Sequence, residues 1–257
     1  MRVVSLTCSN TEIVCALGAA DTLVGVDDHS DYPEDVVQRL PRVGPDLGID
    51  VDEVAALRPD LVLASLTVPG HERVVERLER AGLPFIAPAP TRLPHVYDDV
   101  RQIAARLGRA AAGEALVRRL ELALDPAPPA PAANAPKILV EWWPKPVIVP
   151  GRESWVTDMI ERAGGVSVLG HEAVKSRPIT DDEARALDPD IVVIAWCGVP
   201  FAKYRAEVVY RRPAWQSIAA LRERRVHPIA EAYLGRPGPR LVHGLEALRA
   251  LVQEHAE

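Results

Sequence analysis

Short apolar runs alternate with amphipathic stretches along most of this chain. The runs that predict strands lie at residues 3–6, 23–26, 61–64, 85–86, 137–142, 191–195 and 226–229. The stretches with helical spacing lie at 11–17, 73–81, 155–163 and 214–222. Runs that are apolar at every position are typical of parallel strands buried on both faces. The pattern therefore predicts an α/β fold with parallel sheets covered by helices on both sides.

One stretch of sequence occurs twice. Residues 48–65 read GIDVDEVAALRPDLVLAS and residues 178–196 read PITDDEARALDPDIVVIAW. In each copy a capping residue, Asp50 or Thr180, precedes a short helix, with a glutamate three residues later as a capping box requires. A proline then ends the helix before the buried strand. The duplication predicts two similar lobes.

A different element lies between the two copies. Residues 94–124 carry apolar side chains at helical spacing and predict one helix about 45 Å long. Gly108 and Gly113 are the places where it could kink or break. A proline- and alanine-rich connector, 125–136, follows. The chain is thus expected to divide into an N-terminal lobe (1–93), a backbone helix (94–124), this connector and a C-terminal lobe (137–257), and a stiff helix predicts small lobe movements.

Composition narrows the class of protein. The chain has 257 residues, 48% of them hydrophobic, and a formal charge of −6 without a basic run, which argues against nucleic acid as a partner. Three cysteines, Cys8, Cys15 and Cys197, do not make a disulfide framework. No segment is long and apolar enough to span a membrane. Met1 leads directly into a strand without a leader, so a cytoplasmic monomer is expected, or a periplasmic or extracytoplasmic one if a leader was removed.

Ligands of open α/β sheets bind beyond the carboxyl ends of the strands. In the first lobe the candidate binding residues at these ends are His29, Tyr32 and Ser65. In the second lobe they are Trp142, Trp143, Trp196, Tyr233 and Arg236. Aromatic side chains with few charges favour a large, flat, partly apolar ligand. The alternative is that these aromatics belong to the core.

Motifs for chemistry are sparse. His29, in the polar loop DDHSDYP, could be an axial ligand of a chelated metal or simply an exposed loop histidine, and no second histidine at ligand spacing supports a metal site made by protein alone. Ser9 and Glu12 fit a capping box or, alternatively, an anion site at a helix N-terminus. Phosphate-binding, hydrolase, zinc-protease and dinucleotide motifs are absent, and no histidine is placed beside Cys197. The chain is therefore not expected to be an enzyme.

Several longer pieces carry a resemblance: SNTEIVCALGAADTLVGV, HSDYP, PDLVLAS, HERVVERL, VPGRESWVTDMIERAGG and YLGRPGPRLVHGLEAL. In order and spacing they resemble the cobalamin- and iron-siderophore-binding proteins of ABC importers, and they are most similar to the cobalamin binders. The resemblance implies a class III periplasmic-binding-protein fold, with two Rossmann-like lobes joined by one long rigid helix. It also implies that a corrinoid such as cobalamin is held without a covalent bond in the cleft between the lobes, for ABC-type uptake or intracellular handling.

The resemblance also implies roles by position. His29, Trp142 and Tyr233 fall on aromatic positions of the cleft, whereas Leu66 and Ala87 stand where cobalamin binders have tryptophan. Glu72 matches an acidic residue that docks onto an ABC permease.

The resemblance implies a second acidic docking residue, in the C-terminal lobe. Gly235 occupies that position in this chain, and Glu231 is a substitute if the loop bends.

Two alternative functions stay open. One is a haem or iron-siderophore binder, and the other is a cytoplasmic sensor, carrier or small α/β enzyme.

Overall fold

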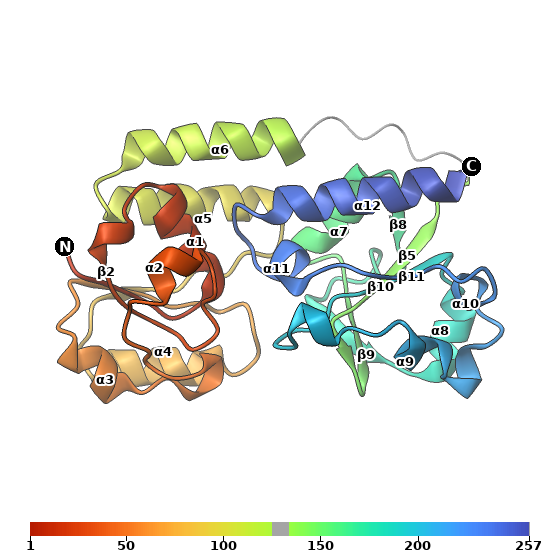
Figure 1. Ribbon diagram of the computed structural model, residues 1–257, viewed down its shortest axis with the longest axis horizontal. Helices are drawn as coiled ribbons and strands as arrows, with labels where there is room; N and C mark the ends of the chain where they lie inside the picture. Colours follow the sequence, from red (N-terminus) through yellow and green to blue (C-terminus); the bar gives the residue numbers. More distant parts are fainter. Residues whose placement is uncertain (125–133, 257) are drawn as a thin grey trace. The chain divides into compact units, whose positions relative to one another are not determined.

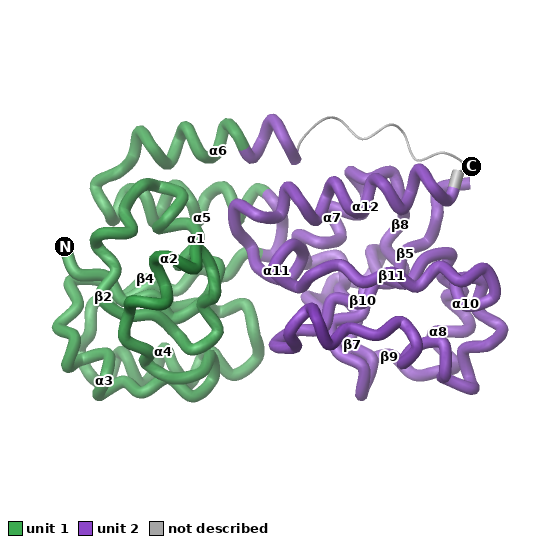
Figure 2. Tube along the Cα trace, viewed as in Figure 1, with its two compact units in different colours: residues 1–90, 94–119 green, residues 91–93, 120–257 purple. Residues whose placement is uncertain are grey.

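The computed structural model describes residues 1–124 and 134–256 and forms two compact units (Figures 1 and 2). Unit 1 comprises residues 1–90 and 94–119, and unit 2 comprises residues 91–93 and 120–257. Most of the expected connector, residues 125–133, lies outside the described residues.

Unit 1 is built on a parallel sheet. Its strands are β1 (Val3–Ser5), β2 (Leu23–Val26), β3 (Leu61–Leu63) and β4 (Phe85–Ile86), in the order β2-β1-β3-β4. Its shorter helices are α1 (Cys8–Ala16), α2 (Glu34–Val37), α3 (Val51–Ala56) and α4 (His71–Arg80). Apolar side chains of β1 and β3 pack with those of α3 and α4 in one buried cluster. Figure 1 shows α3 and α4 on one side of this sheet and α1 on the other.

Unit 2 contains a second parallel sheet. Its strands are β5 (Lys137–Glu141), β8 (Val166–Ser167), β10 (Ile191–Ile194) and β11 (Val226–Pro228), in the order β8-β5-β10-β11. Its helices are α7 (Trp155–Arg162), α8 (Asp181–Leu187), α9 (Glu207–Tyr210), α10 (Ala219–Arg222), α11 (Glu231–Leu234) and α12 (Leu241–Ala256). The expected α/β class with parallel sheets is confirmed in both units.

A second, antiparallel sheet in unit 2 was not predicted. It consists of β6 (Trp143–Pro144), β7 (Val147–Pro150) and β9 (Ser176–Ile179), in the order β6-β7-β9. The β6–β7 hairpin follows β5 directly, so it projects from the carboxyl end of a central strand. This position makes the hairpin part of the candidate binding surface.

The duplicated sequence forms the same local structure in both units. The Asp50 carboxylate accepts hydrogen bonds from the first backbone N–H groups of α3, and Thr180 forms a complete capping box with Glu183 at α8. The residue before each proline, Arg58 or Asp188, has a positive φ, +47° and +42°. Each helix then leads into a central strand, β3 or β10. The repeat is therefore a repeat of helix, left-handed turn and buried strand.

The expected single helix over 94–124 is wrong. The chain forms two helices, α5 (Leu93–Arg106) and α6 (Ala110–Leu124), separated at Gly108, whose φ is +68°. The N–H groups of Gly108 and Arg109 donate to the carbonyls of Ala105 and Ala104, which is the Schellman pattern that ends a helix at a left-handed glycine.

The two helices pack side by side at Gly113. A Cβ at Gly113 would lie only 2.5 Å from the Cβ of Ala104, so this glycine permits a close approach of α6 to α5. The Arg101 Nε also lies 3.2 Å from a carboxylate oxygen of Glu114. The linking element is therefore a helical hairpin. The expectation of small lobe movements depended on one stiff, continuous helix, so the structure does not support that argument.

The Asp99 carboxyl on α5 is expected to make the stability of the protein depend on pH. Burial, with repulsion from Asp98 as the second cause, raises the pKa of the Asp99 carboxyl to about 7. The folded protein then binds this proton more tightly than the unfolded chain, so stability falls as the pH rises from about 4 through 7. We expect Asp99→Asn to raise the free energy of unfolding by about 1–2 kcal/mol at pH 8, allowing for solvent screening, and to change it little at pH 4. Urea unfolding at both pH values measures this, and equal effects would contradict it.

Candidate functional site

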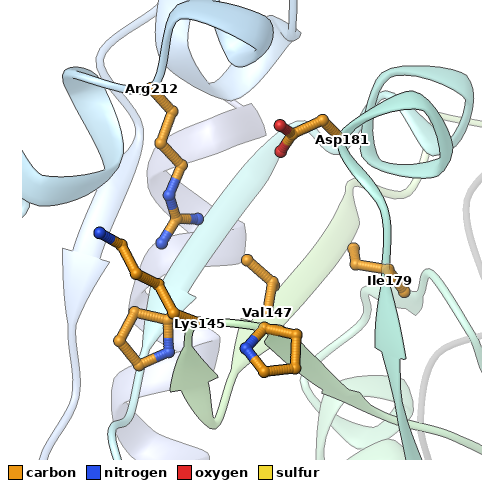
Figure 3. A pocket seen from close by; sticks show the side chains of 7 residues that line it. Lys145, Val147, Ile179, Asp181 and Arg212 are labelled. Atoms are coloured by element: carbon orange, nitrogen blue, oxygen red, sulfur yellow. The ribbon is translucent and has the colours of Figure 1, made fainter.

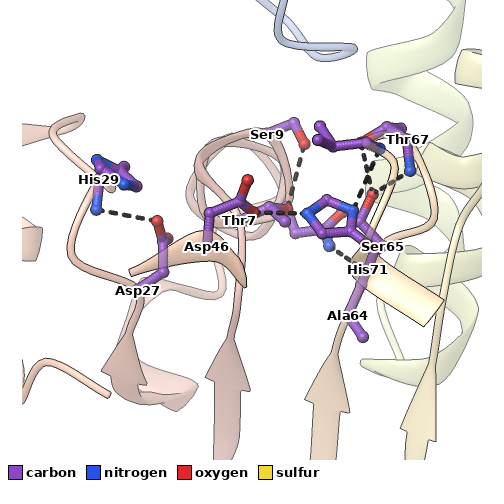
Figure 4. A network of polar contacts seen from close by, with 12 residues as sticks. Thr7, Ser9, Asp27, His29, Asp46, Ala64, Ser65, Thr67 and His71 are labelled. Atoms are coloured by element: carbon purple, nitrogen blue, oxygen red, sulfur yellow. Dashed lines mark hydrogen bonds and ion pairs between the residues drawn. The ribbon is translucent and has the colours of Figure 1, made fainter. Parts of the chain in front are cut away.

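The carboxyl edge of the sheet in unit 1 is a hydrogen-bonded polar network (Figure 4). Asp27 follows β2, is buried, and accepts the N–H of His29 at 3.0 Å and the hydroxyl of Ser30 at 2.5 Å. Burial raises the pKa of the Asp27 carboxyl. The Arg42 guanidinium donates to the carbonyl oxygens of Asp27 and Ser30, each at 2.7 Å. These bonds fix the loop that carries two of the predicted binding residues.

His29 and Tyr32 are both exposed on this loop. The Cys8 thiol donates to the carbonyl oxygen of His29 at 3.0 Å, which anchors the backbone of the loop to the start of α1. The side chain of Tyr32 is 48% exposed. The structure thus presents both side chains at the carboxyl end of β2, where the sequence placed them.

Helix α1 begins at Cys8, so Ser9 lies within the helix and the expected capping box from Ser9 to Glu12 is wrong. Ser9 and Glu12 are buried, and the N-cap residue Thr7 makes no capping hydrogen bond through its side chain. Asn10 instead ties α1 to the end of β3, because its amide donates to the carbonyl oxygen of Ala64 at 2.8 Å. This start of α1 therefore supports the sheet edge.

The loop after β3 is organised by Ser65 and His71. The Ser65 hydroxyl lies 2.9 Å from that of Thr67 and accepts the Thr67 N–H. The buried His71 accepts the Val68 N–H at Nδ1, so Nε2 carries the proton that it donates to Asp46 at 2.6 Å. The sequence offered no reason to single out this histidine, since its partner Asp46 is distant in the chain. His71 holds the loop that precedes the exposed Glu72 of α4.

In unit 2 the predicted tryptophans separate into two kinds. Trp143 is 42% exposed on the β6–β7 hairpin, and its indole N–H donates to the carbonyl oxygen of Lys145 at 3.1 Å. Trp142 is half-buried, and its carbonyl oxygen accepts the N–H of Cys197 at 3.0 Å. Trp196, by contrast, is only 5% exposed, and its indole N–H donates to Glu141 at 2.8 Å. The structure favours the core interpretation for Trp196.

Arg212 lines a recess of about 370 Å³ in unit 2 (Figure 3). It also forms an ion pair with Glu141. Glu141 is fully buried, and both of its carboxylate oxygens accept from the guanidinium of Arg212, at 2.6 and 2.8 Å. The guanidinium also stacks 4.5 Å from the ring centroid of Trp215. The other residues that line the recess are Pro144, Lys145, Pro146, Val147, Ile179 and Asp181.

Tyr233 lies at the end of unit 2 near the N-terminus of α12. Its half-buried ring packs edge-on against His243, with 5.2 Å between centroids, and the Arg240 guanidinium lies 5.7 Å away. Arg236 pairs with Glu231 at 3.0 Å, and both side chains are mostly buried.

Glu231 occupies the space beside Gly235. A Cβ at Gly235 would lie 2.8 Å from a carboxylate oxygen of Glu231. Glu231 is therefore engaged with Arg236 and packed on Gly235, which counts against it as a substitute docking residue.

Three aromatic side chains are exposed in the described part of the chain: Tyr32, Trp143 and Phe201. Each lies in a segment that follows a strand of a parallel sheet, namely β2, β5 and β10. Phe201 is not among the residues predicted from the sequence, because it lies well beyond the end of β10 at Ile194. The sequence does contain a signal for this residue, because Phe201 is an aromatic residue in the loop that follows the predicted strand 191–195.

The described residues offer surfaces for stacking and hydrogen bonding. Within residues 1–124 and 134–256, no three His, Cys, Asp or Glu side chains are grouped so that they could hold a metal ion. Over the same residues, no helix has the length and apolarity needed to cross a bilayer. The arrangement at the strand ends is suited to holding a ligand.

Comparison with known proteins places the chain in a family. The profile described as Periplasmic binding protein matches residues 3–233. An uncharacterized ABC transporter substrate-binding lipoprotein, YvrC, of Bacillus subtilis (strain 168) is 28% identical over 254 residues, covering 96% of this chain and 78% of that protein. A vitamin B12-binding protein of Yersinia pestis (strain Pestoides F) is 24% identical over 195 residues, covering 76% and 69%.

A solved structure agrees with this placement. The periplasmic heme-binding protein RhuT from Roseiflexus sp. RS-1, in apo form, has a TM-score of 0.84 and 26% identity, covering 100% of this chain and 99% of that one. With the family profile extending over most of the chain, the conclusion is direct: this chain belongs to the periplasmic binding protein family, the substrate-binding proteins of ABC uptake systems.

Proposed function

We propose that the chain binds one metal-chelate macrocycle at the carboxyl ends of its strands, with a corrinoid such as cobalamin as the first candidate. The observation that supports this most is the exposure of Tyr32, Trp143 and Phe201 in the segments after β2, β5 and β10. Exposed aromatic rings in such places suit a large ligand with a flat apolar face. Half-buried Trp142 and Tyr233 add to this surface in unit 2.

The relatives support the same ligand class. One is named a vitamin B12-binding protein and another a heme-binding protein, and both ligands are metal-bearing macrocycles. The polar edge of unit 1, with the hydroxyls of Ser65 and Thr67, favours the corrinoid, because its amide side chains both donate and accept hydrogen bonds. Haem is the second candidate, and an iron siderophore is the third. Calorimetric titration of the purified protein against each of the three tests the proposal.

His29 is the proposed contact to the metal or to a polar edge of the ligand. The imidazole is exposed on a loop that Asp27 and Arg42 hold in place. If it coordinates the metal, His29→Ala is expected to shift the visible absorption bands of the complex and to weaken binding about tenfold or more. Absorption spectra of both complexes measure this. An unchanged spectrum would exclude coordination, with Asp28→Ala, at the neighbouring exposed position, as the control.

We propose an ABC permease as the partner and Glu72 as a docking residue. The Glu72 carboxylate lies in the first turn of α4, on an exposed residue. It accepts the N–H of Gly70 at 2.8 Å, and this hydrogen bond holds it in place. The matching position in unit 2 is Gly235, which has no side chain. A location outside the cytoplasm follows from this partner, and we propose it in place of the cytoplasmic expectation.

Loss of Glu72 is expected to have a small effect on permease binding. An exposed ion pair contributes about 0–1 kcal/mol, so Glu72→Ala should weaken capture by a cognate permease no more than about fivefold. Co-purification at two salt concentrations measures this, with Glu76→Ala on the same helix as the control. Complete loss of tight binding in Glu72→Ala alone would show that one acidic contact suffices.

A further inference from the structure

We propose that Phe201 is a further ligand contact of unit 2 and that it favours ligands with a flat apolar face. This inference rests on the proposed function and deepens it. Phe201 is 52% exposed, although its ring is one of the most apolar groups in the chain. The position of this exposed ring, after a strand of the parallel sheet, is where ligands of such sheets bind.

A series of contacts between aromatic rings holds Phe201 in place. The Phe201 ring packs edge-on against Tyr204, with 5.3 Å between centroids. Tyr204 packs against Trp196, with 5.4 Å between centroids, and its hydroxyl donates to the Trp196 carbonyl oxygen at 2.7 Å. Trp196 and Tyr204 are both buried, so these ring contacts begin in the core and end at the exposed ring of Phe201.

The backbone around Phe201 is also tied down. Phe201 begins a short 3-10 helix, Phe201–Lys203, in which the N–H of Tyr204 donates to the Phe201 carbonyl oxygen at 3.0 Å. The Arg205 guanidinium donates to the carbonyl oxygens of Ala202 and Tyr204, each at 2.7 Å. A side chain that is ordered before binding loses little conformational entropy when a ligand packs on it.

Phe201 and Trp143 belong to neighbouring segments of the same sheet edge. Trp143 follows β5 and Phe201 follows β10, and these strands pair in parallel, with Ile194 opposite Glu141. The N–H of Cys197 donates to the Trp142 carbonyl oxygen, which joins the two segments just beyond the strands. Two exposed rings therefore leave adjacent strands at the end where ligands of such sheets bind.

The test compares Phe201→Ala with wild type against three probes: cyanocobalamin, hemin and the ferric hydroxamate ferrichrome. A stacking aromatic contributes about 0.5–1.5 kcal/mol beyond its area, so we expect affinity for the macrocycle that wild type binds to fall about three- to tenfold. Phe201→Trp should retain the affinity. Val208→Ala is the matched control, because Val208 is an exposed apolar residue of the same unit, on α9.

The outcomes separate this inference from the proposed function. If wild type and Phe201→Ala bind the same macrocycle equally well, the inference about Phe201 is wrong and the proposed function stands. The same conclusion holds if Phe201→Ala is impaired only in permease capture. Wild-type protein that binds ferrichrome alone would contradict both the preference for a flat ligand and the macrocycle of the proposed function. Wild-type protein that binds none of the probes would overturn both. Equal thermal unfolding of Phe201→Ala and wild type is expected, because the ring is half in solvent.

Discussion

Arg212→Ala is expected to lower the free energy of unfolding by about 3–5 kcal/mol. The substitution leaves the carboxylate of Glu141 without its counter-ion, and Glu141 is fully buried. It also removes the guanidinium that stacks on Trp215. Removing one partner of a buried pair costs more than the pair contributes, because the remaining charge is neither solvated nor neutralised. Urea unfolding followed by circular dichroism measures the loss.

Two control variants identify the cause. Adding Glu141→Gln to Arg212→Ala should restore most of the stability, because a neutral amide oxygen still accepts the indole N–H of Trp196. Lys145→Ala changes an exposed residue that lines the same recess and should stay within about 0.5 kcal/mol of wild type. A deficit in the double variant as large as in Arg212→Ala would show that lost packing, and not the buried charge, is responsible.

Gly244→Ala is expected to lower the free energy of unfolding by about 2–3 kcal/mol. Gly244 lies in α12, where replacing glycine by alanine would by helix propensity alone stabilise by up to about 1 kcal/mol. Here the new Cβ would overlap the carbonyl oxygen of Tyr233 and approach Leu234 and Met159 to 2.9 Å. A backbone oxygen cannot rotate away, so α11 must move relative to α12.

The same substitution should also weaken ligand binding, because Tyr233 moves with α11. Glu246→Ala, at an exposed position of the same helix, is the control for both measurements and should leave stability and affinity near wild type. Thermal unfolding and ligand titration of the two variants measure the effects. A Gly244→Ala protein as stable as wild type would show that α11 shifts without cost.

The elements that could be predicted are those set by local pattern. The strand pattern identified every strand of the two parallel sheets except β8 (Val166–Ser167), whose two residues do not form an apolar run. The repeat identified matching helix–strand units because capping residues and prolines act within a few positions. Gly108 was noted as a place where a long helix could break, but whether a glycine ends a helix depends on the packing that follows. Here Gly113 lets α6 return along α5.

The features that could not be predicted depend on partners distant in the chain. Trp143 and Trp196 both follow predicted strands. Trp196 is buried against Glu141 and Tyr204, whereas Trp143 is exposed on the β6–β7 hairpin. His71 holds its loop through a hydrogen bond to Asp46, which is distant in the chain. The antiparallel sheet needs pairing between β7 and β9, and the intervening residues give no local signal of it. The sequence could therefore place the candidate residues at strand ends, but it could not tell which of their side chains are exposed there.

The central claim is that one metal-chelate macrocycle binds at the strand ends. Isothermal titration of the purified chain with cyanocobalamin, with hemin and ferrichrome in parallel, tests it most directly. We predict saturable binding of cyanocobalamin at one per chain, with a Kd in the micromolar range or below, equivalent to about −8 kcal/mol or more favourable. Binding of hemin alone would move the assignment to haem. Absence of binding to either macrocycle at about 100 μM would contradict the claim.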